Sequence, residues 1–457
     1  MSGVRLQRKV GLAGAVFLMV GNVVGASIFI LPGNLAGIAG PAVFIAYLIA
    51  IIPAFFNTLV AAQVGSILPV SASDYVFTST VLHPLLGFLK VWAAMLGALV
   101  GGPILAYGFA DYFAFFMPDA SRLTVAVTVV VVIMVINLLG IRSSVKIQMV
   151  MVSIFVTALL ILSLGGLFYI DLDLLIPMAP MGWNAVLSAA VPAYFSYTGF
   201  TMLLAITEEI RNPAKNIPLI TFYTFLIVAF IYISVTFVVP GLIPWKELSA
   251  IAAPLSAAAA TFLPEWYSTA ITLAALLAAG TSINMIIITA SRSFFAVARN
   301  RIYPDIFNRV SRRTGEPDTT IILVAVVILA GITFQGNIAQ YASVSVIGWM
   351  LYGIIWGIAL VLLPKKLPDH YNNAQFKLSK KWLWITAVVN IVMGTLFIFI
   401  AVRDNTAPAL GYFFLLFLGV VYYLLRQRVL AKEGISLEAL LKNEVEEASR
   451  ATQEAIP

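Results

Sequence analysis

The sequence predicts an all-α polytopic membrane protein with twelve transmembrane helices. Hydrophobic side chains make up 61% of the 457 residues and charged side chains only 10%, and the mean hydropathy is +1.00. A composition this apolar suits a chain whose surface faces lipid. Twelve stretches are apolar over about 20 residues, the length that crosses roughly 30 Å of hydrocarbon. The predicted spans cover residues 11–36, 41–67, 86–116, 122–140, 146–170, 184–209, 217–240, 266–298, 319–336, 338–363, 382–402 and 407–426.

The distribution of basic residues orients these spans. Residues 1–10 are basic and show no small-residue cleavage site, so we expect a cytoplasmic N-terminus and a first span that is retained. Twelve crossings from that start leave only Arg122, Lys246 and Arg403 on the outer side. This bias follows the positive-inside rule and supports the count of spans. The tail, residues 427–457, is then cytoplasmic as well.

Two polar segments are not expected to cross the membrane. Residues 240–265 contain several prolines and polar residues, which predicts an outer loop with short helices. From Gly434 onward, leucines alternate with acids and bases at helical spacing, which predicts a cytoplasmic surface helix.

The composition excludes several classes of function. The chain has no cysteine, which excludes disulfides and thiol chemistry, and its two histidines, His83 and His370, are too far apart in the sequence to favour a metal centre. The net charge of +7 comes from basic segments that flank apolar ones, so it reflects membrane topology and not nucleic-acid binding. An enzyme would need a nucleophile with a base, a carboxylate pair or a metal cluster, and the sequence shows no such pattern. The expected surroundings are a lipid bilayer, with no nucleic-acid partner.

The first span is interrupted near its middle. Residues 21–33, GNVVGASIFILPG, place three glycines and a proline within an apolar run. In hydrocarbon every backbone N–H and C=O needs a partner, so such a break is tolerated where it faces protein, an ion or a ligand. A second half-helix that begins near Ala26 and Ser27 would direct its free N–H groups and positive dipole end toward an anion. A glycine-mediated helix contact or a proline kink is the alternative.

The sixth span has a second interruption, where FSYTGF at 195–200 follows Pro192. It matches the position of the first break if the chain consists of two halves of five spans, residues 11–170 and 184–363, followed by two further spans in residues 382–426. Interrupted helices at corresponding positions in two halves indicate a binding site at the repeat interface. Two unrelated flexible helices are the alternative.

Five motifs resemble the amino acid-polyamine-organocation (APC) transporter superfamily, and together they extend over nearly the whole chain. They are GNVVGASIF in the first span, PVSASDYVF at 69–77, NLLGIRSSVKIQ at 137–148, FSYTGF with EEIRNPAKNIP at 195–218, and the Asn284 region with SRSFFAVARNRIYPDIFNRVSRRTGEP at 291–317. The motif at 69–77 departs from the family, which usually has a glycine pair where Ala72 and Ser73 stand. The resemblance implies the leucine-transporter fold: two inverted five-helix repeats with helices 1 and 6 unwound, plus two C-terminal helices.

The same resemblance implies an amino acid site between the two breaks. The α-carboxylate of the substrate is expected on backbone N–H groups of Gly25, Ala26 and Ser27. Its ammonium is expected at the negative end of the first half of helix 6, on carbonyls of Phe195, Ser196 and Thr198. Phe195 also matches the position of the family's aromatic gate, which covers the substrate from outside.

Two departures from relatives bear on specificity and coupling. Thr201 stands where some relatives have an acid after the unwound part of helix 6, so a cationic side chain would lack a counter-charge and neutral amino acids are favoured. Phe155 stands where proton-coupled relatives have a lysine in helix 5. The ammonium that takes the place of a coupling cation in those relatives is therefore missing.

A sodium ion could occupy that place. The neurotransmitter:sodium symporters, which share the fold, hold one sodium ion on carbonyls and hydroxyls of helices 1 and 8. The matching residues in this chain are Gly21, Val24, Ala278, Thr281 and Ser282. Five uncharged oxygens suit a monovalent cation better than a divalent one, which normally recruits carboxylates. The alternative is that Thr281 and Ser282 bond to their own helix. No other cofactor is expected.

Together these patterns predict a secondary active transporter (permease) of neutral amino acids in the cell membrane, with alternating access and sodium-coupled symport, and not an enzyme. A sodium-independent exchanger and a proton symporter stay open within the same class. A transporter-like nutrient receptor is the alternative from another class, but it would need a large cytoplasmic domain, whereas residues 427–457 form only a short tail.

Overall fold

The computed structural model describes residues 10–68, 73–140, 145–205, 207, 210–311, 313–334, 337–435 and 440. Over these residues the secondary structure is helical, and the only β pairing is an isolated bridge between Val10 and Ile210. Parts of the sequence motifs, residues 69–72, 141–144 and 208–209, lie outside the described residues. Most of the predicted tail helix from Gly434 onward also lies outside them.

The α-helices in chain order are α1 (Leu12–Val24), α2 (Ser27–Ala39), α3 (Val43–Ile67), α4 (Ser73–Val81), α5 (Pro84–Phe113), α6 (Arg122–Leu138), α7 (Val145–Leu160), α8 (Trp183–Phe195), α9 (Pro213–Leu242), α10 (Trp245–Leu248), α11 (Pro254–Ala260), α12 (Glu265–Arg299), α13 (Asp318–Ile332), α14 (Ile338–Lys366), α15 (Pro368–Asn372), α16 (Lys380–Asp404) and α17 (Thr406–Lys432). Short 3₁₀ segments are η1 (Gly40–Ala42), η3 (Leu172–Leu175), η4 (Thr198–Ala205) and η6 (Asp305–Asn308), and η2 (Ile161–Gly165) is a π-helical turn. Residues 240–265 contain α10 and α11, as the sequence predicts.

Seven helical runs among the described residues are long and apolar enough to cross a membrane. They are the run Leu12–Ile67, which contains α1 to α3, and the helices α5, α9, α12, α14, α16 and α17. Three shorter apolar helices cover Arg122–Leu138, Met149–Gly165 and Asp318–Ile332. The chain is therefore an all-helical, multi-pass membrane protein. Within the described residues each predicted span coincides largely with helix, whereas the count of twelve crossings and the inverted repeat stay predictions.

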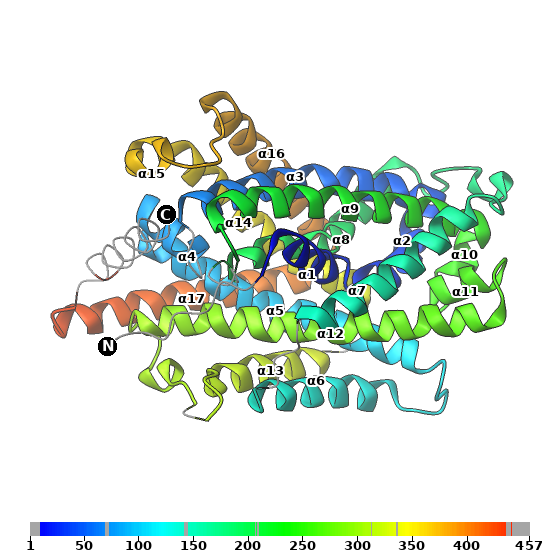
Figure 1. Cartoon of the computed structure of the whole chain (residues 1–457), viewed down its shortest axis with the longest axis horizontal. Helices are drawn as coiled ribbons and strands as arrows, with labels where there is room; N and C mark the ends of the chain where they lie inside the picture. Colours follow the sequence, from blue (N-terminus) through cyan, green and yellow to red (C-terminus); the bar gives the residue numbers. More distant parts are fainter. Residues whose placement is uncertain are drawn as a thin grey trace.

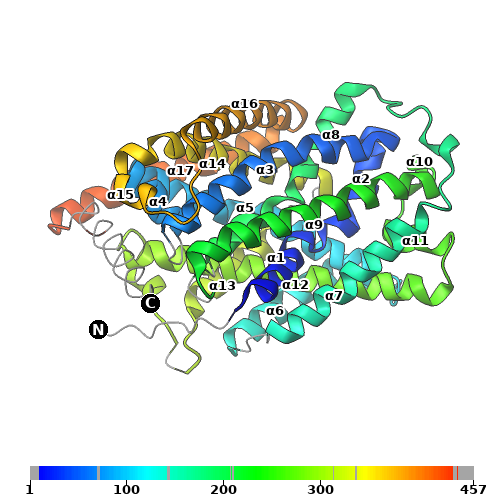
Figure 2. The ribbon, with the colours of Figure 1, turned by 45° about the horizontal axis from the view of Figure 1, so that its top comes forward.

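The long helices run along the long axis of the molecule, with α1 and α2 among them (Figure 1). At one end lie α4 and α15, and at the opposite end lie α10 and α11; we call these the α4 end and the α10 end (Figure 1). Helix α3 runs beside α9 and also contacts α8, and α5 packs against α12, α13 and α14 (Figure 2). In the most apolar 18-residue stretch of α17 only 22% is buried, against 61% in that of α14. Helix α17 therefore lies at the periphery, where its side chains can face lipid. The broken helices are thus enclosed by long ones.

Candidate functional site

The first break separates α1 from α2 at Gly25. Its φ of 37° lies on the positive side, which favours glycine, and a Cβ there would lie 2.2 Å from Ser282 Oγ of α12. Gly25 N–H donates to the carbonyl of Gly21 at 3.2 Å, and Ala26 N–H donates to Ser282 Oγ at 3.3 Å. Two of the predicted carboxylate donors therefore have partners within the protein.

The second break follows α8. The chain leaves α8 at Phe195 through two tight turns, in which Ser196 N–H donates to Ala193 O at 3.0 Å and Tyr197 N–H to Tyr194 O at 2.9 Å, and it continues as η4. The hydroxyl of Thr198 donates to the carbonyl of Phe195 at 2.8 Å. The predicted break is therefore present, and the second half of this span is a 3₁₀ helix over the residues of η4.

Tyr232 of α9 joins the two breaks. Its hydroxyl lies 2.7 Å from the carbonyl oxygen of Val23, 3.2 Å from that of Val24 and 2.9 Å from that of Ser196. The amide of Asn22 adds a second link, because its Nδ2 donates to the carbonyl of Gly199 at 3.0 Å. The sequence reasoning missed both links: Asn22 is a polar residue inside the first motif, but Tyr232 carries no sequence signal.

A single cavity of about 460 Å³ lies against both breaks. All six residues of the predicted amino acid site line it, namely Gly25, Ala26, Ser27, Phe195, Ser196 and Thr198. The cavity extends to the end of α12 and the loop after it, where Val310, on its wall, is 46% exposed. Asn300 at that end donates to the hydroxyl of Tyr75 of α4 at 3.2 Å, so the cavity opens at the α4 end.

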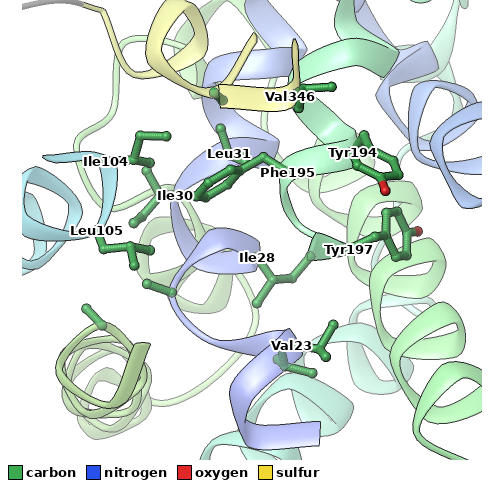
Figure 3. Close-up of a cluster of buried hydrophobic side chains, with 14 of the residues drawn as sticks. Val23, Ile28, Ile30, Leu31, Ile104, Leu105, Tyr194, Phe195, Tyr197 and Val346 are labelled. Atoms are coloured by element: carbon green, nitrogen blue, oxygen red, sulfur yellow. The ribbon is translucent and has the colours of Figure 1, made fainter. Parts of the chain in front are cut away.

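Phe195 lies at the closed end of the cavity. Figure 3 shows its ring beside Ile30 of α2, within a cluster that includes Ile104 of α5 and Val346 of α14. The ring is 8% exposed, and a Cβ added at Gly101 of α5 would lie 3.0 Å from it. Phe195 therefore separates the cavity from the packed apolar side chains beyond it.

Of the five residues of the predicted sodium site, Gly21 and Val24 belong to α1, and Ala278, Thr281 and Ser282 belong to α12. Of these residues, Ser282 lines the cavity. The hydroxyl of Thr281 donates to the carbonyl of Ala278 at 2.9 Å, a bond within its own helix. The carbonyls of Gly21 and Val24 accept bonds from Gly25 N–H and the Tyr232 hydroxyl. Sodium binding stays a prediction.

The sequence reasoning also missed a charged pair on the cavity wall. Asp74 of α4 and Lys90 of α5 form a salt bridge, and both side chains are buried. Asp74 belongs to the motif at 69–77, and Lys90 lies near the inner end of the predicted third span. Lys90 occupies a predicted membrane span, where a charge is uncommon, and this was the signal that could have revealed it.

These features define a class of protein: a helical membrane protein with a cavity against two broken helices. The chain belongs to the amino acid permease family, whose model matches residues 10–424. This result confirms the resemblance found in the sequence, and the family consists of transporters and not enzymes. Transport of amino acids is therefore supported.

The individual relatives are distant in sequence, and their names state different substrates. The branched-chain amino acid permease BcaP of Bacillus subtilis (strain 168) is 26% identical over 386 residues, 80% of this chain and 82% of the relative. The vacuolar cationic amino acid transporter 4 of Arabidopsis thaliana is 26% identical over 389 residues, 80% and 64% of the two chains. The methylthioribose transporter of Bacillus subtilis (strain 168) is 25% identical over 440 residues, which are 88% of this chain and 95% of the relative.

Proposed function

We propose that this protein is a secondary active transporter that carries neutral amino acids across the cytoplasmic membrane by alternating access. The observation that carries the proposal is that both helix breaks open on the same cavity. The substrate carboxylate would bind at the start of α2, around Ser27, where the helix dipole is positive. The substrate ammonium would bind at the end of α8, around Ser196, where the dipole is negative.

The charges on the cavity wall disfavour substrates with cationic side chains. Asp74 is paired with Lys90, and toward the mouth Arg292 and Arg299 accompany Glu316. Thr201 lines the cavity at the position where some relatives have an acid. Among the described residues that line the cavity, a cationic side chain near the breaks would therefore meet no unpaired carboxylate.

The α4 end is assigned to the cytoplasm in this proposal. Helix α14 ends there in Lys365 and Lys366, and Arg426 Nε donates to the carbonyl of Arg301 at 3.0 Å, so basic residues gather at this end. By the positive-inside rule the conformation described here is open to the cytoplasm and closed to the outside at Phe195. Both termini would then be cytoplasmic.

Sodium coupling is the finer part of the proposal. It is supported by the spacing of Gly21, Val24, Ala278, Thr281 and Ser282 in the sequence, and by the contact of Ser282 Oγ with Ala26 N–H at the first break. Phe155 is fully buried, and its side chain carries no ammonium that could take the role of a coupling cation. A sodium-independent exchanger and a proton symporter are the competing mechanisms.

Uptake into proteoliposomes tests the proposal. Purified protein is offered a panel of labelled amino acids with imposed sodium, proton or potential gradients. We expect uptake of neutral amino acids, faster with an inward sodium gradient than with choline at fixed pH and potential. The methyl ester of the best substrate should compete roughly ten- to a hundredfold less well, because it loses a charge-assisted hydrogen bond.

Each part of the proposal has its own contradicting result. Equal uptake in sodium and choline would exclude sodium coupling and favour the exchanger. Preferred uptake of cationic amino acids would contradict the neutral specificity. An ester that competes as well as its parent amino acid would contradict the assignment of the carboxylate to the first break.

A further inference from the structure

The Asp74–Lys90 ion pair lies on the cavity wall, but neither residue belongs to the helix breaks. Asp74 Oδ1 also accepts the N–H of Tyr75 at 2.8 Å, and Lys90 Nζ lies 5.2 Å from the centre of the Tyr352 ring of α14. Both members of the pair are less than 10% exposed. Ionisable side chains buried in a membrane protein are costly and commonly mark substrate pathways. The pair is therefore in a position to affect which substrates move along the cavity.

The pair lies between the helix breaks and the mouth. One face of α5 lines the cavity with Lys90, Ala94, Gly97, Ala98 and Leu105. Gly101, on the same face, lies against the ring of Phe195 at the closed end. Lys90 precedes Gly101 by 11 residues, which corresponds to about 16 Å along an α-helix. A substrate that moves from the breaks to the mouth must pass the pair.

The lysine sets the net charge of this part of the wall. Without its ammonium, the buried carboxylate of Asp74 would lose its salt-bridge partner, and a cleft with low-dielectric walls concentrates the field of such a charge. A unit charge about 10 Å away, at an effective dielectric constant near 20, changes the binding of a charged group by roughly tenfold. An amino acid with a neutral side chain responds much less, because its ammonium and carboxylate respond in opposite directions.

We propose that Lys90 is a specificity-determining residue: its ion pair with Asp74 keeps this part of the passage neutral and so disfavours amino acids with charged side chains there. The inference rests on the proposed transport of neutral amino acids, and it adds the residues that discriminate against charged ones. The pair acts through its field along the path and not through contact with the substrate's α-carboxylate or ammonium.

The test measures uptake of leucine, arginine and glutamate by the same proteoliposomes. Lys90→Met leaves Asp74 unpaired, so at mildly alkaline pH, where the carboxylate stays ionised, the ratio of arginine to leucine uptake should rise about tenfold. Asp74→Asn leaves Lys90 unpaired, so at mildly acidic pH, where the ammonium stays protonated, the ratio of glutamate to leucine uptake should rise. The double variant Asp74→Asn with Lys90→Met is neutral again, and both ratios should return to wild-type values.

Lys246→Met is the matched control, because Lys246 is an exposed lysine near an aromatic ring at the α10 end, outside the cavity. Both uptake rates in each ratio are measured on the same proteoliposomes, so a lower yield of assembled protein does not change the ratio. If Lys90→Met does not assemble, Asp74→Asn provides the test. Single variants with wild-type ratios overturn the inference. So does a parallel loss of all three substrates that is largest in the double variant, because that is the result of a purely structural pair. A wild-type protein that moves no neutral amino acid would contradict the proposed function itself.

Discussion

Tyr232 links the two broken helices through one hydroxyl group. A phenol has a single proton, so Tyr232 can donate to only one of its three neighbouring carbonyls at a time. The shortest contact, 2.7 Å, is to Val23 O, and that to Ser196 O is 2.9 Å. The ring is fixed separately, because it packs edge-on against Tyr47 and Tyr197 at centroid distances of 5.8 Å and 5.0 Å. The hydroxyl therefore lies against carbonyls of both breaks, while packing of the ring fixes its position independently.

Tyr232→Phe should weaken substrate binding about tenfold or more. The substitution keeps the ring and removes the donor, and a buried carbonyl left without its partner costs about 1–3 kcal/mol. Binding of the labelled substrate to purified protein measures the effect. Tyr267→Phe is the matched control, because the Tyr267 hydroxyl donates to Ala158 O at 2.8 Å, away from the cavity. Equal affinity in wild-type protein and Tyr232→Phe would show that the hydroxyl does not organise the site.

At the scale of single residues the sequence predicted backbone positions better than side-chain partners. Gly25 and Ser196 could be recognised because helix breaks leave a local pattern of glycine and proline. Tyr232 meets Val23 across 209 residues of sequence, and one apolar helix does not reveal which of its faces meets another. Asp74 and Lys90 were visible as charges, but their pairing depends on how α4 turns back against α5.

At the scale of elements, the small residues of α5 make room for the cavity. Gly97 lines it, and a Cβ built at Gly97 would have no atom within 4 Å apart from its chain neighbours and the helix backbone. Gly101, one turn further, is already in contact with Phe195. Space on this helix face is therefore open at Gly97 and filled at Gly101.

Gly97→Val should shift the preference toward smaller neutral amino acids with little loss of assembled protein. The added methyl groups enter the cavity and not a packed interface, and one methylene in an apolar site changes relative specificity by about tenfold or more. Competition by alanine and leucine for uptake measures the shift. Gly411→Val in α17 is the matched control, since it also places valine in an open position on a helix, outside the cavity. An unchanged alanine to leucine ratio would contradict this assignment of the wall.

The positions of the elements could be predicted more fully than their conformations. The eighth predicted span, residues 266–298, is α12 (Glu265–Arg299), and the seventh, residues 217–240, lies within α9 (Pro213–Leu242). Hydropathy gives these positions because the length of an apolar run is a local property. The conformation of Thr198–Ala205 was not predictable in this way, because it is set by contacts with α1, α3 and α12.

At the scale of the whole molecule, the cavity opens at the α4 end. Ala94 lies on its wall and is partly exposed, whereas Ala106, on another face of the same helix and outside the cavity wall, is fully buried. The natural chain has no cysteine, so a single introduced thiol can be followed without background.

In substrate-free protein, Ala94→Cys should react with a membrane-impermeant thiol reagent from the cytoplasmic side, and Ala106→Cys should be protected. Labelling in right-side-out and inside-out vesicles measures both rates. If alternating access is correct, conditions that favour the opposite conformation should reduce the labelling of Ala94→Cys. Faster labelling of Ala106→Cys than of Ala94→Cys would contradict the conformation described here.

The 3₁₀ conformation of η4 makes the second half of the sixth predicted span longer than an α-helix of the same residues would be. A 3₁₀ helix rises about 2.0 Å per residue and an α-helix 1.5 Å, so the 8 residues Thr198–Ala205 are about 4 Å longer than the same residues would be as α-helix. Rewinding this one segment would draw the chain beyond it toward the second break by that distance and rotate it about the axis, because the number of residues per turn changes as well. With Thr198 held in place, a change from 3₁₀ to α conformation would therefore both shift and rotate the chain that follows Ala205.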